Sequence, residues 1–112
     1  GAPGRARWEI VAFEQGIGMR SRSELVYRLP EGFRRFQARA GMDAELGDRG
    51  AVRLIVRGDN QVLFDRELEG RDGSLAIDLE IDRVRTLTLV VDYGSDGGIG
   101  DRVYLCTPRI MK

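Results

Sequence analysis

The sequence predicts an all-β protein, an antiparallel β-sandwich of about eight strands. Residues 52–56, 75–81 and 87–91 alternate apolar and polar side chains, and turn residues separate these stretches. A period of two is typical of strands with one buried and one exposed face. Because an apolar sheet face needs a second layer to cover it, the pattern favours two packed sheets.

The expected strands follow from this alternation and from the turn residues between them. Glycines at 16 and 18 indicate a sharp connection after the first strand, Pro30-Glu31-Gly32 predicts a turn, and Gly58-Asp59-Asn60 predicts a tight hairpin. Between 34 and 42, the small residues Ala38 and Ala40 share one face with Phe36, which suggests close approach to the opposite sheet. The expected strands are residues 8–13, 23–29, 34–42, 51–57, 61–68, 75–81, 86–93 and 102–111.

Length and charge limit the classes of function. The 112 residues fit a single domain, 1–112, and carry 18 basic and 18 acidic side chains, so no excess of positive charge favours nucleic acid as a partner. Seventeen of the 18 basic residues are arginine, which is consistent either with guanidinium groups selected to bind hydroxyls and carboxylates or with a compositional bias. No segment resembles a membrane span or a signal peptide, and we expect the domain to be excised from a longer protein.

Few residues could support catalysis. The chain has no histidine, and its single cysteine, Cys106, lies beside Val103 and Leu105, where we expect it to be buried. An acid-pair glycosidase would need two of the carboxylates in or beside loops, which are more often solvated turn formers. Those carboxylates are Asp43, Glu45, Asp48, Asp59, Asp96 and Asp101. The sequence therefore predicts a protein that is not an enzyme.

A run of polar side chains before the alternation at Leu25 is the first candidate binding site. Arg20, Arg22 and Glu24 belong to this run, which either lines a polar pocket or forms a surface ladder of ion pairs. The preceding Gly16-Ile17-Gly18 is not followed by a helix, so it does not predict a phosphate site.

The order of several segments resembles the NPCBM family of carbohydrate-binding modules. The resemblance rests on their succession over residues 16–110: residues 16–29, 36–43, 52–59, 62–64, 87–92 and 101–102. It implies a galactose-binding-like jelly roll and a non-catalytic accessory module that binds carbohydrate. It also implies attachment to other domains of a parent chain that is secreted or displayed at a cell surface. Where the family commonly has histidines, this chain has Arg20 and Arg102, and Tyr104 stands where the family often has tryptophan. These departures imply either a changed ligand, such as an acidic sugar, or a module that has lost sugar binding.

If binding is retained, we expect loops at one end of the sandwich to form the site. Arg20, Arg22 and Arg102 would donate to ligand oxygens, Glu24 or Asp101 would accept from hydroxyls, and Tyr104 would stack on a sugar ring. The alternatives are an internal Arg20–Asp101 ion pair and a core position for Tyr104.

No cofactor is expected apart from a possible structural calcium, since galactose-binding-like domains often carry one. Its candidate ligands are Asp43, Glu45 and Asp48, in the polar loop 43–50. The rival to glycan binding is a structural or protein-interaction domain whose exposed arginines contact a neighbouring domain; those arginines are Arg35, Arg39, Arg53 and Arg57.

Overall fold

The computed structural model describes residues 10–12, 16–20, 22–42, 51–69, 73–94 and 102–112. The described residues form nine strands and no helix. The strands are β1 (Ile10–Ala12), β2 (Gly16–Arg20), β3 (Ser23–Arg28), β4 (Arg35–Met42), β5 (Ala51–Gly58), β6 (Gln61–Glu69), β7 (Leu75–Glu80), β8 (Thr86–Tyr93) and β9 (Arg102–Met111). The all-β prediction is confirmed. In the described part of the chain there is no helix that could cross a membrane.

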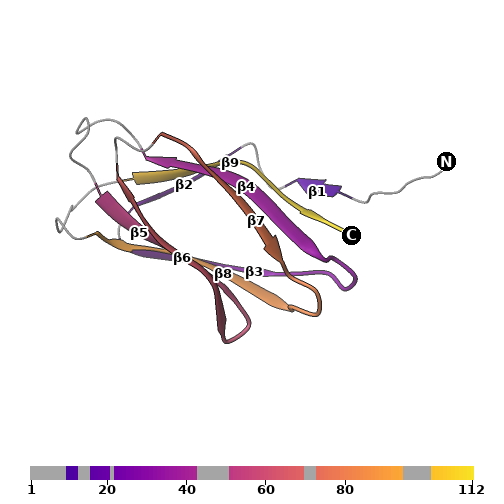
Figure 1. The fold of residues 1–112 in the computed structure, drawn as a ribbon. Coiled ribbons are helices and arrows are strands. Elements are labelled where there is room, and N and C mark those ends of the chain that lie inside the picture. Colours follow the sequence, from indigo (N-terminus) through magenta and orange to yellow (C-terminus); the bar gives the residue numbers. More distant parts are fainter. Residues whose placement is uncertain (1–9, 13–15, 21, 43–50, 70–72, 95–101) are drawn as a thin grey trace.

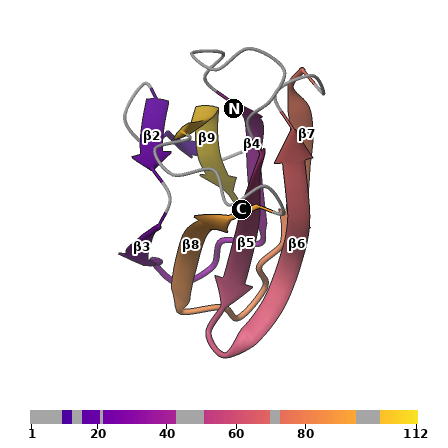
Figure 2. The same cartoon turned by 90° about the vertical axis from the view of Figure 1, so that its left-hand side faces the viewer.

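The strands form two antiparallel sheets that face each other (Figures 1 and 2). Sheet I has the order β1-β9-β4-β7, and β2 pairs with β9 alongside β1. Sheet II has the order β3-β8-β5-β6. Apart from β5 and β6, which are consecutive, the paired strands are far apart in the sequence, so both sheets depend on long-range pairing.

The core lies between the sheets and follows the alternation in the sequence. Phe36, Leu54 and Leu89 are fully buried. The neighbours of Phe36 along β4 are polar, whereas Leu89 in β8 is followed by Val90, which is apolar and only 3% exposed. The inward face expected for β4 is confirmed, because Ala38 and Ala40 are buried beside Phe36. Burying a side chain the size of Phe36 stabilises the fold by about 1.5–3 kcal/mol.

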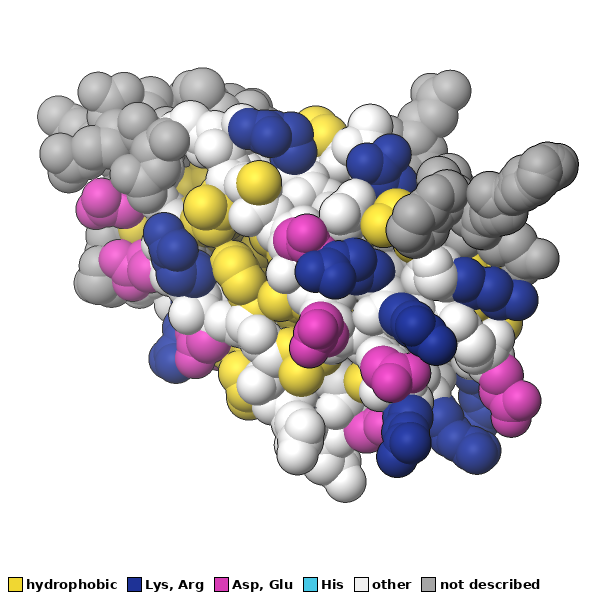
Figure 3. All heavy atoms as spheres, turned by 45° about the vertical axis from the view of Figure 1, so that its right-hand side comes forward, with side chains coloured by type: hydrophobic (Ala, Val, Ile, Leu, Met, Phe, Trp, Pro, Cys, Tyr) yellow, Lys and Arg dark blue, Asp and Glu magenta, His cyan; other side chains and the backbone are white. Residues whose placement is uncertain are grey.

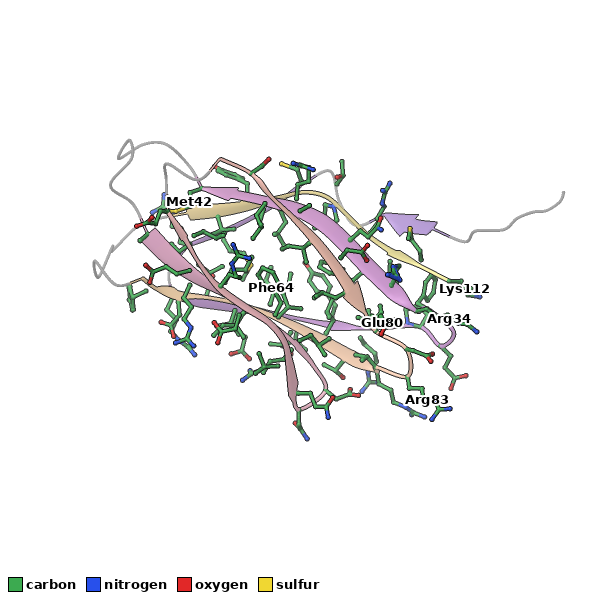
Figure 4. All side chains as sticks on the ribbon, in the orientation of Figure 1. Arg34, Met42, Phe64, Glu80, Arg83 and Lys112 are labelled. Carbon is green, nitrogen blue, oxygen red and sulfur yellow. The ribbon has the colours of Figure 1, made fainter. Side chains whose placement is uncertain are left out.

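One side of the sandwich leaves hydrophobic side chains partly exposed. The edge strands β6 and β7 contribute Leu63, Phe64, Leu75 and Leu79, which pack against the core and are half-buried. Figure 4 shows Phe64 between the two sheets, and Figure 3 shows hydrophobic side chains reaching the surface as a group among charged ones.

A bulge in β9 changes which residues of that strand face the core. Gln37 of β4 pairs with Arg109, but Arg39 pairs with Cys106, so Ala38 lies opposite two residues, Thr107 and Pro108. Val103 and Leu105 point inward before the bulge, whereas Pro108 and Ile110 point inward after it. The extra residue, Thr107, has a positive φ of 48°, a conformation that is unusual for a β-branched residue.

The prediction for Cys106 is wrong, because the structure exposes this residue. Leu105 points into the core, so Cys106, the next residue along the strand, points outward. Its apolar neighbours in the sequence face the opposite side of the sheet.

The segment expected as a glycine-rich connection is in part a strand. Gly16 to Arg20 forms β2, which pairs with β9 from Cys106 to Arg102. β9 is ten residues long, and β1 occupies only Arg109 to Met111, so the rest of the same edge is available to β2.

Turns at the end that carries the C-terminus match the sequence signals. In the β5–β6 hairpin, Asp59 has a φ of 53°, and its carboxylate accepts hydrogen bonds from the backbone N–H groups of Arg85 and Thr86 at 3.1 and 3.0 Å. Figure 4 shows Arg34, Arg83 and Lys112 at this end and Met42 at the opposite end.

Candidate functional site

Tyr104 is exposed on the outward face of sheet I, between two glycines. It pairs with Gly18 of β2 on one side and with Gly41 of β4 on the other. The flanking residues Met19 and Val103 are buried, which fixes Tyr104 and both glycines on the outward face. The side chain is 38% exposed, so the alternative that Tyr104 is a core residue is wrong.

The two glycines on either side of Tyr104 differ in what surrounds them. A Cβ atom placed on Gly18 would lie 3.2 Å from Cε1 of Tyr104, so the ring leans over β2 at that point. A Cβ atom on Gly41 would have no atom of the described residues within 4 Å. On the Gly41 side, therefore, no described side chain lies next to the ring on the outward face. A flat ring beside an open surface is suited to stacking against the C–H face of a sugar.

Arg20 and Arg102 lie one row further toward the end of sheet I. They pair with each other across β2 and β9, two residues from Gly18 and Tyr104 respectively. Arg20 is exposed, and its backbone carbonyl accepts a hydrogen bond from the Ser23 hydroxyl, which holds the chain as it leaves β2. Among the described residues, no carboxylate forms an ion pair with Arg20. Its guanidinium therefore adds hydrogen-bond donors near the ring.

Asp101 lies outside the described residues, and so does the side chain of Arg102. The expected roles of these two side chains, and the alternative Arg20–Asp101 ion pair, stay predictions.

Arg22 and Glu24 lie elsewhere. Arg22 follows β2, and its Nε is 3.4 Å from a carboxylate oxygen of Asp92 at the end of β8. Glu24 is on the outward face of sheet II, 3.9 Å from Nη2 of Arg57. The structure thus brings Arg20 and Tyr104 onto one face and places Glu24 on the other sheet.

The expected calcium ligands Asp43, Glu45 and Asp48 lie outside the described residues. In the part of the chain that the structure describes, no group of three carboxylate, cysteine or histidine side chains could hold a metal ion. The calcium site stays a prediction.

The two glycines beside Tyr104 are part of the candidate site that the sequence did not reveal. The strict inward alternation of Phe36, Ala38 and Ala40 predicts that Gly41 points outward. The sequence does not indicate that β9 lies beside β4 or that the register places Tyr104 there.

The comparison with protein families decides the classification. The sequence profile of the NPCBM/NEW2 domain family matches residues 6–111. This chain belongs to the NPCBM/NEW2 domain family. The resemblance seen in the sequence is confirmed. No curated protein matches this chain.

Solved structures similar to this NPCBM/NEW2 domain are carbohydrate-binding modules. The CBM51 of Clostridium perfringens GH95, in complex with methyl-galactose, is 31% identical with a TM-score of 0.75, and the match covers 89% of this chain and 72% of that chain. CBM51-2 with INT domains from Clostridium perfringens ZmpB, in complex with GlcNAc, is 23% identical with a TM-score of 0.77, covering 87% and 22% of the two chains. The tandem CBM51 modules of the family 98 glycoside hydrolase Sp3GH98 from Streptococcus pneumoniae are 19% identical with a TM-score of 0.73, covering 86% and 31%.

The similarities to ZmpB and Sp3GH98, at 23% and 19% identity, support the fold alone. This NPCBM/NEW2 domain spans less than a third of those two chains, and 10% of a Clostridium perfringens ZmpB structure that contains the M60 catalytic domain. The expected antiparallel sandwich of the galactose-binding-like type is thus confirmed by the architecture and by the modules that share it.

Proposed function

We propose that this chain is a non-catalytic carbohydrate-binding module that holds a sugar on the outward face of sheet I, against the ring of Tyr104. The supporting observation is the exposed ring between Gly18 and Gly41, where neither neighbouring strand has a side chain to block a ligand. Sugar complexes of similar modules, one with methyl-galactose and one with GlcNAc, support the ligand class.

Arg20 is proposed as the donor to the sugar's oxygens. It lies two residues from Gly18 on the same outward face and has no ion-pair partner among the described residues. A guanidinium presents five N–H donors in a plane, which suits the oxygens of a sugar or of a carboxylate. The proposed site is thus an open surface beside the ring of Tyr104, with the guanidinium of Arg20 at its border.

The module is proposed to be a single accessory domain, residues 1–112, of a larger protein. This proposal rests on the similar modules, which belong to much longer chains. Secretion or surface display is part of the same proposal. The isolated domain should show no turnover of an aryl glycoside.

The rival function, a domain that contacts its neighbours through exposed arginines, is less well supported. Three of the four arginines it depends on already face a carboxylate of their own chain. Arg35 binds Asp78 at 2.9 Å, Arg53 binds Asp65 at 2.6 Å, and Nη2 of Arg57 is 3.9 Å from Glu24; Arg39 is the fourth. These side chains have less to gain from a new partner.

The direct test is an NMR titration of the ¹⁵N-labelled chain with methyl-galactose and with GlcNAc. We expect the amide signals of Gly18, Gly41 and Tyr104 to shift with saturation. Gly41→Val should abolish these shifts and leave the fold intact, because a Cβ atom there meets no described atom within 4 Å, whereas the valine side chain would stand beside the ring. Saturable shifts confined to sheet II would refute the proposed site, and silence toward a panel of neutral and acidic sugars would refute the function.

A further inference from the structure

A hollow of about 300 Å³ lies on the outward face of sheet I, across strands β4, β7 and β9. We call it the sheet-face hollow. Its lining residues are Gln37, Ala38, Arg39, Ala76, Ile77, Asp78, Thr107 and Arg109. β4 runs along its middle, between β9 and β7 (Figure 1).

A small side chain on one side and a bulge in the backbone on the other create this space. Ala76 lies directly opposite Arg39, so the position across β7 has only a methyl group. On the other side, the bulge at Thr107 separates Cys106 from Arg109 by an extra residue. Bulges of this kind often re-aim side chains next to binding sites, and a non-glycine residue held at positive φ is found more often at functional positions.

The walls of the hollow carry positive charge that the described part of the chain does not neutralise. Arg39 donates from Nε and Nη2 to the Ser74 hydroxyl at 3.4 and 3.1 Å, and Arg109 donates from Nη2 to the side-chain amide oxygen Oε1 of Gln37 at 3.1 Å. Both acceptors are neutral, and no described carboxylate forms an ion pair with either guanidinium. Each guanidinium keeps further donors for a ligand.

Among the described residues, Asp78 is the one acid that lines the hollow, and it already has hydrogen-bond partners. Asp78 accepts from Nε of Arg35 at 2.9 Å through one oxygen and from Nε2 of Gln37 at 3.3 Å through the other. Its charge is thus opposed by Arg35, and the net field at Arg39 and Arg109 favours an anion. Two guanidiniums from neighbouring strands are suited to a planar carboxylate or a sulfate group.

The hollow continues the face that carries Tyr104. Cys106 and Arg39 form the next outward row after Tyr104 and Gly41 in the same register. Arg39 is two residues from Gly41, so the two rows are about 7 Å apart along the strand. A ligand longer than one sugar unit could therefore contact both the ring and the hollow.

We propose that the sheet-face hollow binds the anionic group, a carboxylate or a sulfate ester, of a sugar unit next to the one held at Tyr104. This inference rests on the proposed function, because the first sugar is placed by the ring. It defines the ligand class as an acidic glycan of at least two units, with Arg39 and Arg109 as the residues that select for the charge.

The test compares three disaccharides of similar size: galactobiose, digalacturonic acid and a sulfated galactobiose. NMR titrations at low salt give the affinity of each and the amides that shift. Wild-type chain should bind an acidic disaccharide about ten-fold more tightly than galactobiose, with additional shifts at Ala76 and Thr107. The advantage should fall as salt is added. Comparing the two acidic probes tells whether the carboxylate or the sulfate is preferred.

Variants then assign the effect to the hollow. Arg39→Gln with Arg109→Gln should remove the preference for acidic probes and leave galactobiose affinity within about two-fold, and Arg39→Gln alone serves if the double variant unfolds. Arg66→Gln is the matched control, since Arg66 is an exposed arginine on β6 with no ion pair among the described residues, and it should change nothing.

Equal affinities for neutral and acidic probes, with shifts at Tyr104, would overturn the inference and leave the proposed function standing. A preference for acidic probes that survives the double variant would also overturn it. Absence of shifts at Tyr104 with every probe would remove the proposed function and this inference together.

Discussion

Replacement of Tyr104 by alanine is the perturbation that most directly tests how this module holds a sugar. The side chain is 38% exposed. With roughly 200 Å² of surface for an aromatic residue, about 75 Å² is open to a ligand. Covering that area contributes about 2 kcal/mol at 25 cal/mol per Å², so Tyr104→Ala should weaken sugar binding by about 20-fold. Isothermal titration calorimetry or an NMR titration with methyl-galactose measures the loss.

Two further variants separate stacking from other causes. Tyr104→Phe keeps the ring and should retain affinity within about three-fold, since its lost hydroxyl group accounts for one hydrogen bond at most. Tyr93→Ala removes a tyrosine of sheet II that is 45% exposed, and it should leave affinity unchanged. If Tyr104→Ala bound as well as wild type, or if Tyr93→Ala lost binding to the same extent, stacking on the outward face of sheet I would be refuted.

Two predictions concern stability. Gly94→Ala should lower the free energy of unfolding by about 2–3 kcal/mol, because the added Cβ would lie 2.6 Å from backbone atoms of Ala51. Gly41→Ala should be nearly neutral, because its Cβ would meet no described atom within 4 Å. Urea unfolding of both variants checks this contrast, and equal midpoints would contradict it. The hydrogen bond from Arg53 lowers the pKa of Asp65, so the Asp65 carboxylate stabilises the fold above its unfolded-state pKa and loses that contribution as the pH falls. The difference in free energy of unfolding between wild type and Asp65→Asn should therefore narrow on acidification and with added salt. A difference that widens toward low pH would show that the carboxylate does not stabilise the fold in this way.

The fold could be predicted from the sequence because its information is local. Alternation of apolar and polar residues identified β4 through β9 nearly to the residue, and the glycine and aspartate signal at Asp59 identified the hairpin between β5 and β6. β2 was missed because its glycines indicate a turn when read alone. Only the long β9, far away in the sequence, supplies the partner that makes this segment a strand.

The candidate site was predictable only in part, because it depends on register. Arg20 and Tyr104 were expected to act together, and the structure places them on one face through the pairing of β2 with β9. Arg39 and Arg109 come from strands 70 residues apart, and their proximity follows from the β4–β9 register and its shift at the bulge. No local pattern in the sequence carries that information.

The bulge at Thr107 connects the stability of this module with its binding surface. Val103 and Leu105, before the bulge, point into the core. The extra residue shifts the alternation by one position, so Pro108 and Ile110 also point into the core after it. The same extra residue spreads the outward side chains and opens the hollow beside Arg39. A threonine at positive φ costs about 1–2 kcal/mol, and burial of the residues on both sides offsets that cost. Packing of Pro108 and Ile110 in the core therefore stabilises the bulge that forms one side of the sheet-face hollow.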